Sequence, residues 1–149
     1  GGGRYSATPD RPDGMNGCRG AREGREKAGR ARVAVEDGDV SEVGGAEAMR
    51  SILASGDLPD ALFVSSDLMA RGAYTALREH GHEPGRDIAV IGFDDSAVAT
   101  SLVPALTTVR QPSHDQGRQM ATMLLDVLAG RATANAAILP TEIIERASA

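Results

Sequence analysis

The stretch DIAVIGFDD at residues 87–95 sets six consecutive residues, nearly all apolar, between acidic ends. A short apolar run that begins and ends so abruptly is typical of a strand buried inside a parallel sheet. A second run, ALFV at residues 61–64, follows Pro59 and leads directly into Ser65, Ser66 and Asp67. We therefore expect two buried strands, each followed at its carboxyl end by polar side chains.

Helical patterns separate and surround these strands. Asp67 is expected to cap a helix that Gly81 ends, and Ser41 to cap a helix that runs to about residue 55. A third helix is predicted where Ser113 opens a Ser-x-x-Gln capping box, followed by the apolar stripe Met120, Met123, Leu124, Val127 and Leu128.

Weaker patterns complete the chain. Short strands are predicted at residues 33–36, 138–140 and 143–146, with Pro140 forcing an edge position or a break, and residues 14–30 would form at best a poor helix. The opening GGGRY at residues 1–5 is typical of a loop, so the first strand is expected to precede Gly1. Strands alternating with helices predict an α/β domain, a mainly parallel sheet flanked by helices.

Composition narrows the class of protein. The chain has 149 residues, 41% of them hydrophobic, which suffices for one domain with a real core. A formal net charge of −5 opposes a nucleic-acid-binding surface spread over the whole chain. Glutamates interrupt the basic cluster at residues 19–30, which favours a solvated face over a nucleic-acid site. A lone cysteine, Cys18, and the lack of an apolar run of roughly 20 residues fit a cytoplasmic protein without a membrane anchor.

The polar residues after the two buried strands indicate a ligand site. Ligands of open parallel sheets bind beyond the carboxyl ends of the strands, where Ser65, Ser66 and Asp67 meet Asp94 and Asp95. Hydroxyls and carboxylates at such an edge suit a hydroxyl-rich ligand such as a sugar. The alternative is that Asp67 only caps its helix and that Asp94 and Asp95 are ordinary turn residues.

Four motifs together resemble the lactose/galactose repressor (LacI/GalR) family of bacterial transcriptional regulators. They are PDALFVSSDLMA at residues 59–70, DIAVIGFDD at 87–95, PALTTVRQP at 104–112 and ILPTEIIER at 138–146. Their order and spacing make the combination specific over roughly residues 40 to 148, and RPDGM at residues 11–15 extends it more weakly.

The resemblance implies a sensor of two α/β lobes similar to type I periplasmic sugar-binding proteins, preceded by a helix-turn-helix domain. Residues 1–149 would be a partial effector-binding domain that lacks the DNA reader and has an incomplete second lobe. Residues 1–108 and 138–149 would form the C-terminal lobe, and residues 109–137 would contribute to the N-terminal lobe. The implied partners are a sugar-like effector between the lobes, and operator DNA bound by the absent N-terminal domain.

Carried over by motif, the implied effector contacts are Arg11, Ser66, Asp94, Gln111 and Ser113. Ser66 stands where the family frequently has Asn, and a hydroxyl offers one hydrogen-bonding arm fewer than an amide. The effector is therefore expected to differ from that of better-known members.

The resemblance also implies a homodimer, with Leu68, Arg71 and Leu102 at the contact between C-terminal lobes. Alternatively, Leu102 fills its own core. Two DNA readers held at fixed spacing are what a two-fold operator requires, so a repressor of this class would act as a dimer.

An enzyme is not expected. No Gly-x-Ser-x-Gly elbow surrounds Ser65 or Ser66, and His114 lies in a first helical turn where a solvated side chain is the simpler interpretation. His80 and His82 have no Glu or Cys at metal-binding spacing, so neither a metal nor another cofactor is predicted. The remaining alternative is the solute-binding protein of a sugar ABC transporter, which shares the fold.

Overall fold

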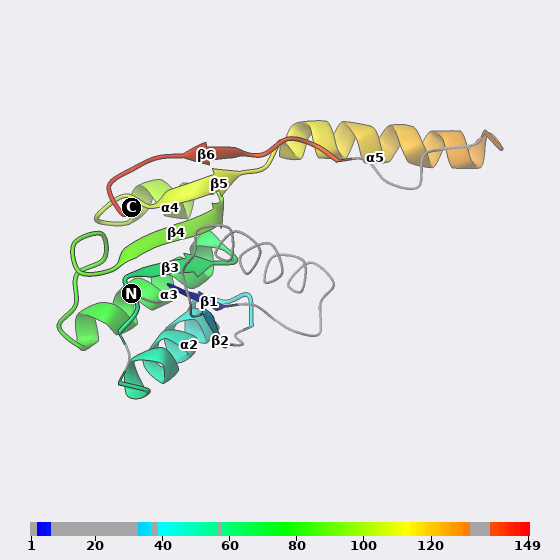
Figure 1. The fold of residues 1–149 in the computed structure, drawn as a ribbon. Coiled ribbons are helices and arrows are strands. Elements are labelled where there is room, and N and C mark those ends of the chain that lie inside the picture. The colour runs from blue at the N-terminus through cyan, green and yellow to red at the C-terminus, as the bar shows by residue number, and fades with distance from the viewer. Residues whose placement is uncertain (1–2, 7–32, 37–38, 57, 132–137) are drawn as a thin grey trace.

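The computed structural model describes residues 3–6, 33–36, 39–56, 58–131 and 138–149. They form a six-stranded sheet in the order β2-β1-β3-β4-β5-β6, parallel except for β6, with helices beside it (Figure 1). In chain order the elements are β1 Gly3–Ser6, β2 Val33–Glu36, α2 Glu42–Ala54, β3 Ala61–Val64, α3 Asp67–Glu79, β4 Ala89–Asp94, α4 Ala97–Ser101, β5 Thr107–Arg110, α5 Ser113–Leu128 and β6 Glu142–Ile144. The predicted α/β architecture is confirmed.

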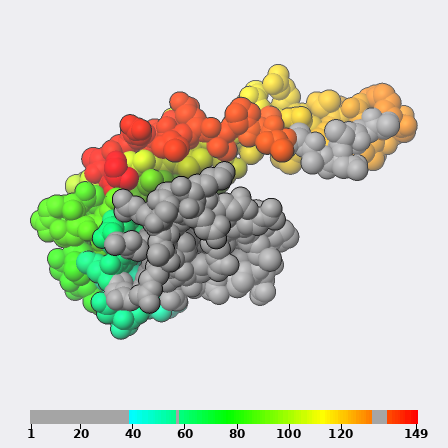
Figure 2. Space-filling model, viewed as in Figure 1, coloured from blue at the N-terminus to red at the C-terminus, as the bar shows by residue number. Residues whose placement is uncertain are grey.

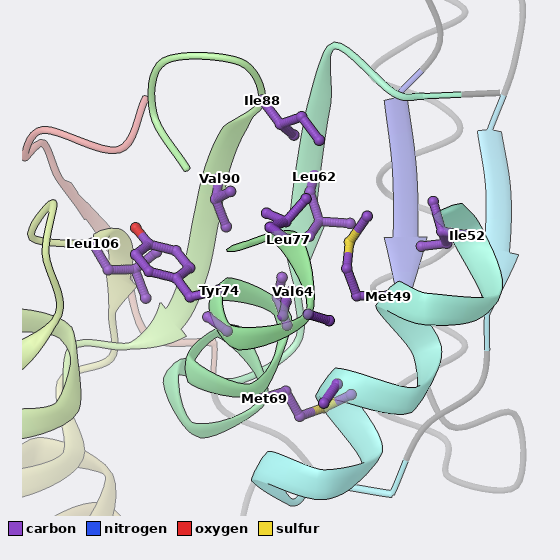
Figure 3. Close-up of a cluster of buried hydrophobic side chains, with 14 of the residues drawn as sticks. Met49, Ile52, Leu62, Val64, Met69, Tyr74, Leu77, Ile88, Val90 and Leu106 are labelled. Carbon is purple, nitrogen blue, oxygen red and sulfur yellow. The ribbon is translucent and has the colours of Figure 1, made fainter. Parts of the chain in front are cut away.

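The two apolar runs form neighbouring inner strands, as expected. Leu62 and Val64 of β3, with Val90 of β4, point into the cluster of buried side chains beneath α3 (Figure 3). On the other side of the same strands, Phe63 and Phe93 meet edge to face with ring centroids 6.4 Å apart. Apolar side chains on both sides explain why these runs lack the alternation of a half-solvated strand.

Helices α2 and α3 pack tightly against each other over the sheet. Two glycines allow the close approach: a Cβ added to Gly72 would lie 1.8 Å from the Glu42 carbonyl oxygen, and one on Gly45 would lie 2.1 Å from that of Met69. Each helix begins at a serine that caps it, because Ser41 Oγ accepts from the amide of the residue three positions on and Ser66 Oγ does the same. The predicted cap of α3, Asp67, is therefore wrong by one residue.

Helix α5 projects away from the rest of the described chain (Figure 1, Figure 2). The helix itself is confirmed, but none of its residues is buried, and Leu124 is 59% exposed. The predicted capping box is absent: Pro112 occupies the N-cap position, and Gln116 Nε2 donates to Gln111 Oε1 instead.

Two strand predictions are corrected. Residues 3–6 form β1, which pairs with β2 on one side and β3 on the other, so Gly3, Arg4 and Tyr5 belong to the sheet and not to a loop. Long-range pairing decides this strand, because its own residues carry almost no apolar signal. Residues 138–140 form no strand, and β6 covers residues 142–144 only. The predicted poor helix at residues 14–30 and the basic cluster lie outside the described residues.

No helix within the described ranges combines the length and apolar character needed to cross a bilayer.

Candidate functional site

The carboxyl ends of β4 and β5 bring two of the predicted site residues together. Asp94 is in register with Arg110, and Gln111 follows directly. Gln111 Nε2 donates a hydrogen bond of 2.9 Å to Asp94 Oδ1, and Gln116 Nε2 donates to Gln111 Oε1 over 3.1 Å. The amide–carboxylate pair offers both donors and acceptors at the edge where ligands of parallel sheets bind.

The turn that carries Asp94 is strained. Asp94 and Asp95 have φ angles of +112° and +54°, a region that side-chain-bearing residues rarely adopt. Such a conformation costs on the order of 1–3 kcal/mol per residue and persists only where neighbouring contacts fix it. Strained residues of this kind gather at binding and active sites, which supports a functional interpretation of this turn.

Arginine side chains secure Asp95, whose side chain is 8% exposed. Arg110 Nε lies 2.6 Å from Asp95 Oδ2, and Arg146 Nη2 lies 2.5 Å from Asp95 Oδ1. Arg146 also donates through Nη1 to the carbonyl of Leu106, 2.8 Å away. Burial raises the pKa of Asp95, but the two guanidinium groups outweigh it and hold that pKa below its usual range.

Asp94 lies in an environment of the opposite kind. Burial raises the pKa of Asp94, the hydrogen bond from Gln111 partly offsets this, and the negative charge of Asp67 raises it further. Among the described residues only the neutral amide of Gln111 donates to this carboxylate. Asp94 therefore keeps acceptor capacity for an incoming hydroxyl, whereas Asp95 is already saturated by cations.

Asp67 is a residue of the site whose contacts the sequence did not predict. It is 1% exposed, and its carboxylate accepts from the amide and hydroxyl of Ser96 and from the hydroxyl of Thr108. The only signal for this in the sequence was Ser66, which can cap α3 and so leaves Asp67 available for other partners.

The remaining predicted effector contacts that the structure describes do not join the Asp94–Gln111 pair. Ser66 is 4% exposed and uses its hydroxyl to accept from the Met69 amide over 3.2 Å. Ser113 is exposed at the first residue of α5. Arg11 lies outside the described residues. The structure thus brings Asp94 and Gln111 together and adds neither Ser66 nor Ser113 to their hydrogen bonds.

The predicted dimer contacts lie at the surface of the described chain. Arg71 makes an ion pair with Glu42, Leu68 is half-buried at the start of α3, and Leu102 packs partly against the core. The contact of Leu102 with its own core agrees with the alternative interpretation and leaves part of the side chain accessible. His114 is exposed, and no cluster of three potential metal ligands occurs in the described parts of the chain.

Comparison with known proteins identifies the family to which this fold belongs. Residues 10–149 match the family model described as a periplasmic binding protein-like domain, so the chain belongs to that family. The solved complex of the transcriptional regulator CelR with cellobiose superposes with a TM-score of 0.92 at 36% identity, covering 99% of this chain and 46% of that one. A lac repressor dimer bound to operator and the anti-inducer ONPF gives 0.92 at 28% identity, covering 99% and 52%.

Curated relatives identify the branch of this family to which the chain belongs. CelR of Thermobifida fusca is 41% identical over 66% of this chain and 29% of its own length. The lactose operon repressor of Escherichia coli K12 is 33% identical over 76% of this chain and 32% of its own length, and that of Rhizobium radiobacter is 41% identical over 70% and 93%. The chain is a sensor domain of the LacI/GalR family of transcriptional regulators and spans about a third of the length of the first two relatives.

Proposed function

We propose that this chain is the effector-sensing part of a cytoplasmic LacI-type repressor, which binds a sugar-like molecule through Asp94 and Gln111 and thereby controls DNA binding. The observation that carries the proposal is the Gln111–Asp94 hydrogen bond on a strained turn at the ligand-binding edge of a parallel sheet. The relatives reported above are regulators, which favours this function over transport.

A sugar hydroxyl both donates and accepts hydrogen bonds, and this pair can satisfy both directions. Asp94 accepts from the sugar while Gln111 accepts through Oε1 or donates through Nε2. Arg11, Ser66 and Ser113 are proposed as further contacts, with the hydroxyl of Ser66 joining after it releases or shares the Met69 amide.

The exit and return of the chain support the proposed division into lobes. The chain leaves the sheet after Arg110, continues into α5, and returns as β6, which pairs antiparallel with β5. Residues 109–137 would then serve the N-terminal lobe, and residues 1–108 and 138–149 the C-terminal lobe. A sugar held between the lobes would favour one relative placement over another and so alter operator affinity in a homodimer contacting through Leu68, Arg71 and Leu102.

The test is calorimetric titration of the full-length protein with cellobiose, lactose and ribose in turn. A sugar that binds should also change the affinity for operator DNA, measured by fluorescence anisotropy. Asp94→Asn and Gln111→Ala should each weaken sugar binding about 10- to 100-fold, the range for hydrogen bonds to a charged group. Glu47→Gln, on the exposed side of α2, is the matched control. Unchanged sugar affinity in Asp94→Asn would overturn the assignment.

A further inference from the structure

Within the described residues, every hydrogen bond to the buried carboxylate of Asp67 comes from another segment of the fold. Its Oδ2 accepts from Ser96 N at 2.7 Å and from Ser96 Oγ at 3.0 Å, and its Oδ1 accepts from Thr108 Oγ1 at 2.6 Å. A carboxylate removed from water needs such donors, because an unpaired buried charge is strongly unfavourable. The three donors come from two separate segments, and Asp67 therefore fastens those segments to each other.

These two segments are the ones that carry the candidate effector contacts. Ser96 directly follows the strained turn of Asp94 and Asp95, and Thr108 lies on β5 three residues before Gln111. Each donor links Asp67 to a segment that carries one of the candidate effector contacts.

Space around the carboxylate is closely fitted. A Cβ added to Gly92 would lie 2.6 Å from Asp67 Oδ1 and 2.6 Å from Leu106 Cδ2. The glycine on β4 thus leaves the space that the carboxylate occupies, and any larger residue there would displace Asp67 or Leu106. A group confined in this way sets a fixed geometry for whatever is bonded to it.

We propose that Asp67 is a positioning residue of the effector site, which fixes Asp94 and Gln111 in their binding geometry by tying the β4 turn to β5. This inference rests on the proposed function, since it concerns the same site. Asp67 contacts no effector itself. Its contribution is preorganisation: the strained turn stays in place before the sugar arrives, so binding loses less conformational entropy.

Ser148 provides a matched control, because it also links β4 to β5 but lies away from the candidate site. Ser148 is fully buried and also joins β4 to β5, because Thr107 N donates to its Oγ at 2.8 Å and that Oγ donates to the Val90 carbonyl at 2.6 Å. These contacts lie at the amino ends of the two strands, opposite the candidate site. Removing the Ser148 hydroxyl should weaken the sheet without moving Asp94 or Gln111.

The experiment uses the full-length protein and five variants: Thr108→Val, Ser96→Ala, Asp67→Asn, Ser148→Ala and Asp94→Asn. Cellobiose affinity is measured by calorimetry, and the side-chain amide resonance of Gln111 is followed by NMR without ligand. Asp94→Asn supplies the reference shift for a Gln111 amide that has lost its charged acceptor. Thr108→Val and Ser96→Ala keep the test decisive where Asp67→Asn does not fold.

We expect Thr108→Val and Ser96→Ala to move the Gln111 amide resonance toward its value in Asp94→Asn and to weaken cellobiose binding at least about fivefold. Ser148→Ala should lower the unfolding midpoint comparably while leaving both readouts at wild-type values. An unmoved Gln111 resonance in Thr108→Val and Ser96→Ala would overturn the inference. Wild-type protein that binds no cellobiose counts against the proposed function for that sugar alone, because the ligand-free NMR result still decides the role of Asp67.

Discussion

Helices α3 and α5 both carry an apolar stripe at helical spacing, yet α3 buries its stripe and α5 exposes it. Tyr74 and Leu77 of α3 are almost inaccessible, whereas Leu124 is largely exposed and Leu128 is 74% exposed. Helix α3 lies over β3 and β4 beside α2, and α5 projects beyond the sheet (Figure 1). The spacing of apolar residues therefore predicts that a segment is helical, but it does not identify what the apolar face will contact.

Because only α3 buries its apolar stripe, truncating a leucine should lower the free energy of unfolding much more in α3 than in α5. In the 149-residue chain, Leu77→Ala should lower the free energy of unfolding by about 2–5 kcal/mol, because it removes contacts and leaves a cavity. Leu124→Ala should change it by about 0.5 kcal/mol or less, since the side chain is already largely solvated. Urea unfolding followed by circular dichroism measures both. Equal losses that depend on protein concentration would show that α5 is covered by self-association.

Two glycines, one in each helix, should respond in opposite ways to the same substitution. In α3, Gly72→Ala would place a methyl group against the Glu42 carbonyl and push α2 away, costing about 1–3 kcal/mol. In α5, nothing lies within 4 Å of a Cβ on Gly117, so Gly117→Ala should stabilise the helix by about 0.5–1 kcal/mol. Thermal unfolding should show shifts of opposite sign. A stabilised Gly72→Ala variant would mean that the two helices are less tightly packed than described.

The parts of the fold that the sequence predicted are those with a local signal. Continuous apolar runs identified β3 and β4, and the serine followed by a helical pattern identified α2. The strand at residues 3–6 had no such signal, because its pairing with β2 and β3 is set by distant residues. The pattern at Ser113 correctly predicted the start of a helix, but its capping box does not form because the Gln116 side chain bonds to Gln111 instead.

The same limit applies to the candidate site. Asp94 was predicted from its position after a buried strand, and its pairing with Gln111 follows from the register of β4 and β5. Asp67 was assigned to the helix cap because its partner Thr108 lies 41 residues away. Arg146, 51 residues from Asp95, gave no signal either. Long-range hydrogen bonds of buried polar groups depend on the completed fold, so single-sequence patterns do not show them.

The adjacent carboxylates Asp94 and Asp95 are expected to affect stability in opposite ways as the pH changes. The pKa of Asp95 is lowered in the folded chain, so its stabilising contribution is present above the unfolded pKa of about 3.9 and is lost as the pH falls through the folded value. The pKa of Asp94 is raised, so its contribution is present below about pH 3.9 and is lost as the pH rises through the folded value. Ionised Asp94 therefore opposes folding at neutral pH, while ionised Asp95 supports it.

Urea midpoints measured between about pH 3 and pH 7 for Asp94→Asn and Asp95→Asn should consequently diverge in sign. Asp95→Asn should be less stable than the wild type at neutral pH. This difference should shrink on acidification, because protonation of Asp95 deprives Arg110 and Arg146 in the wild type of the charged partner that the variant already lacks. Asp94→Asn should match or exceed wild-type stability at neutral pH while binding sugar poorly, as expected of a residue kept for function at some expense of stability. A clearly destabilised Asp94→Asn would instead make Asp94 a structural residue of the turn and weaken its assignment to the effector site.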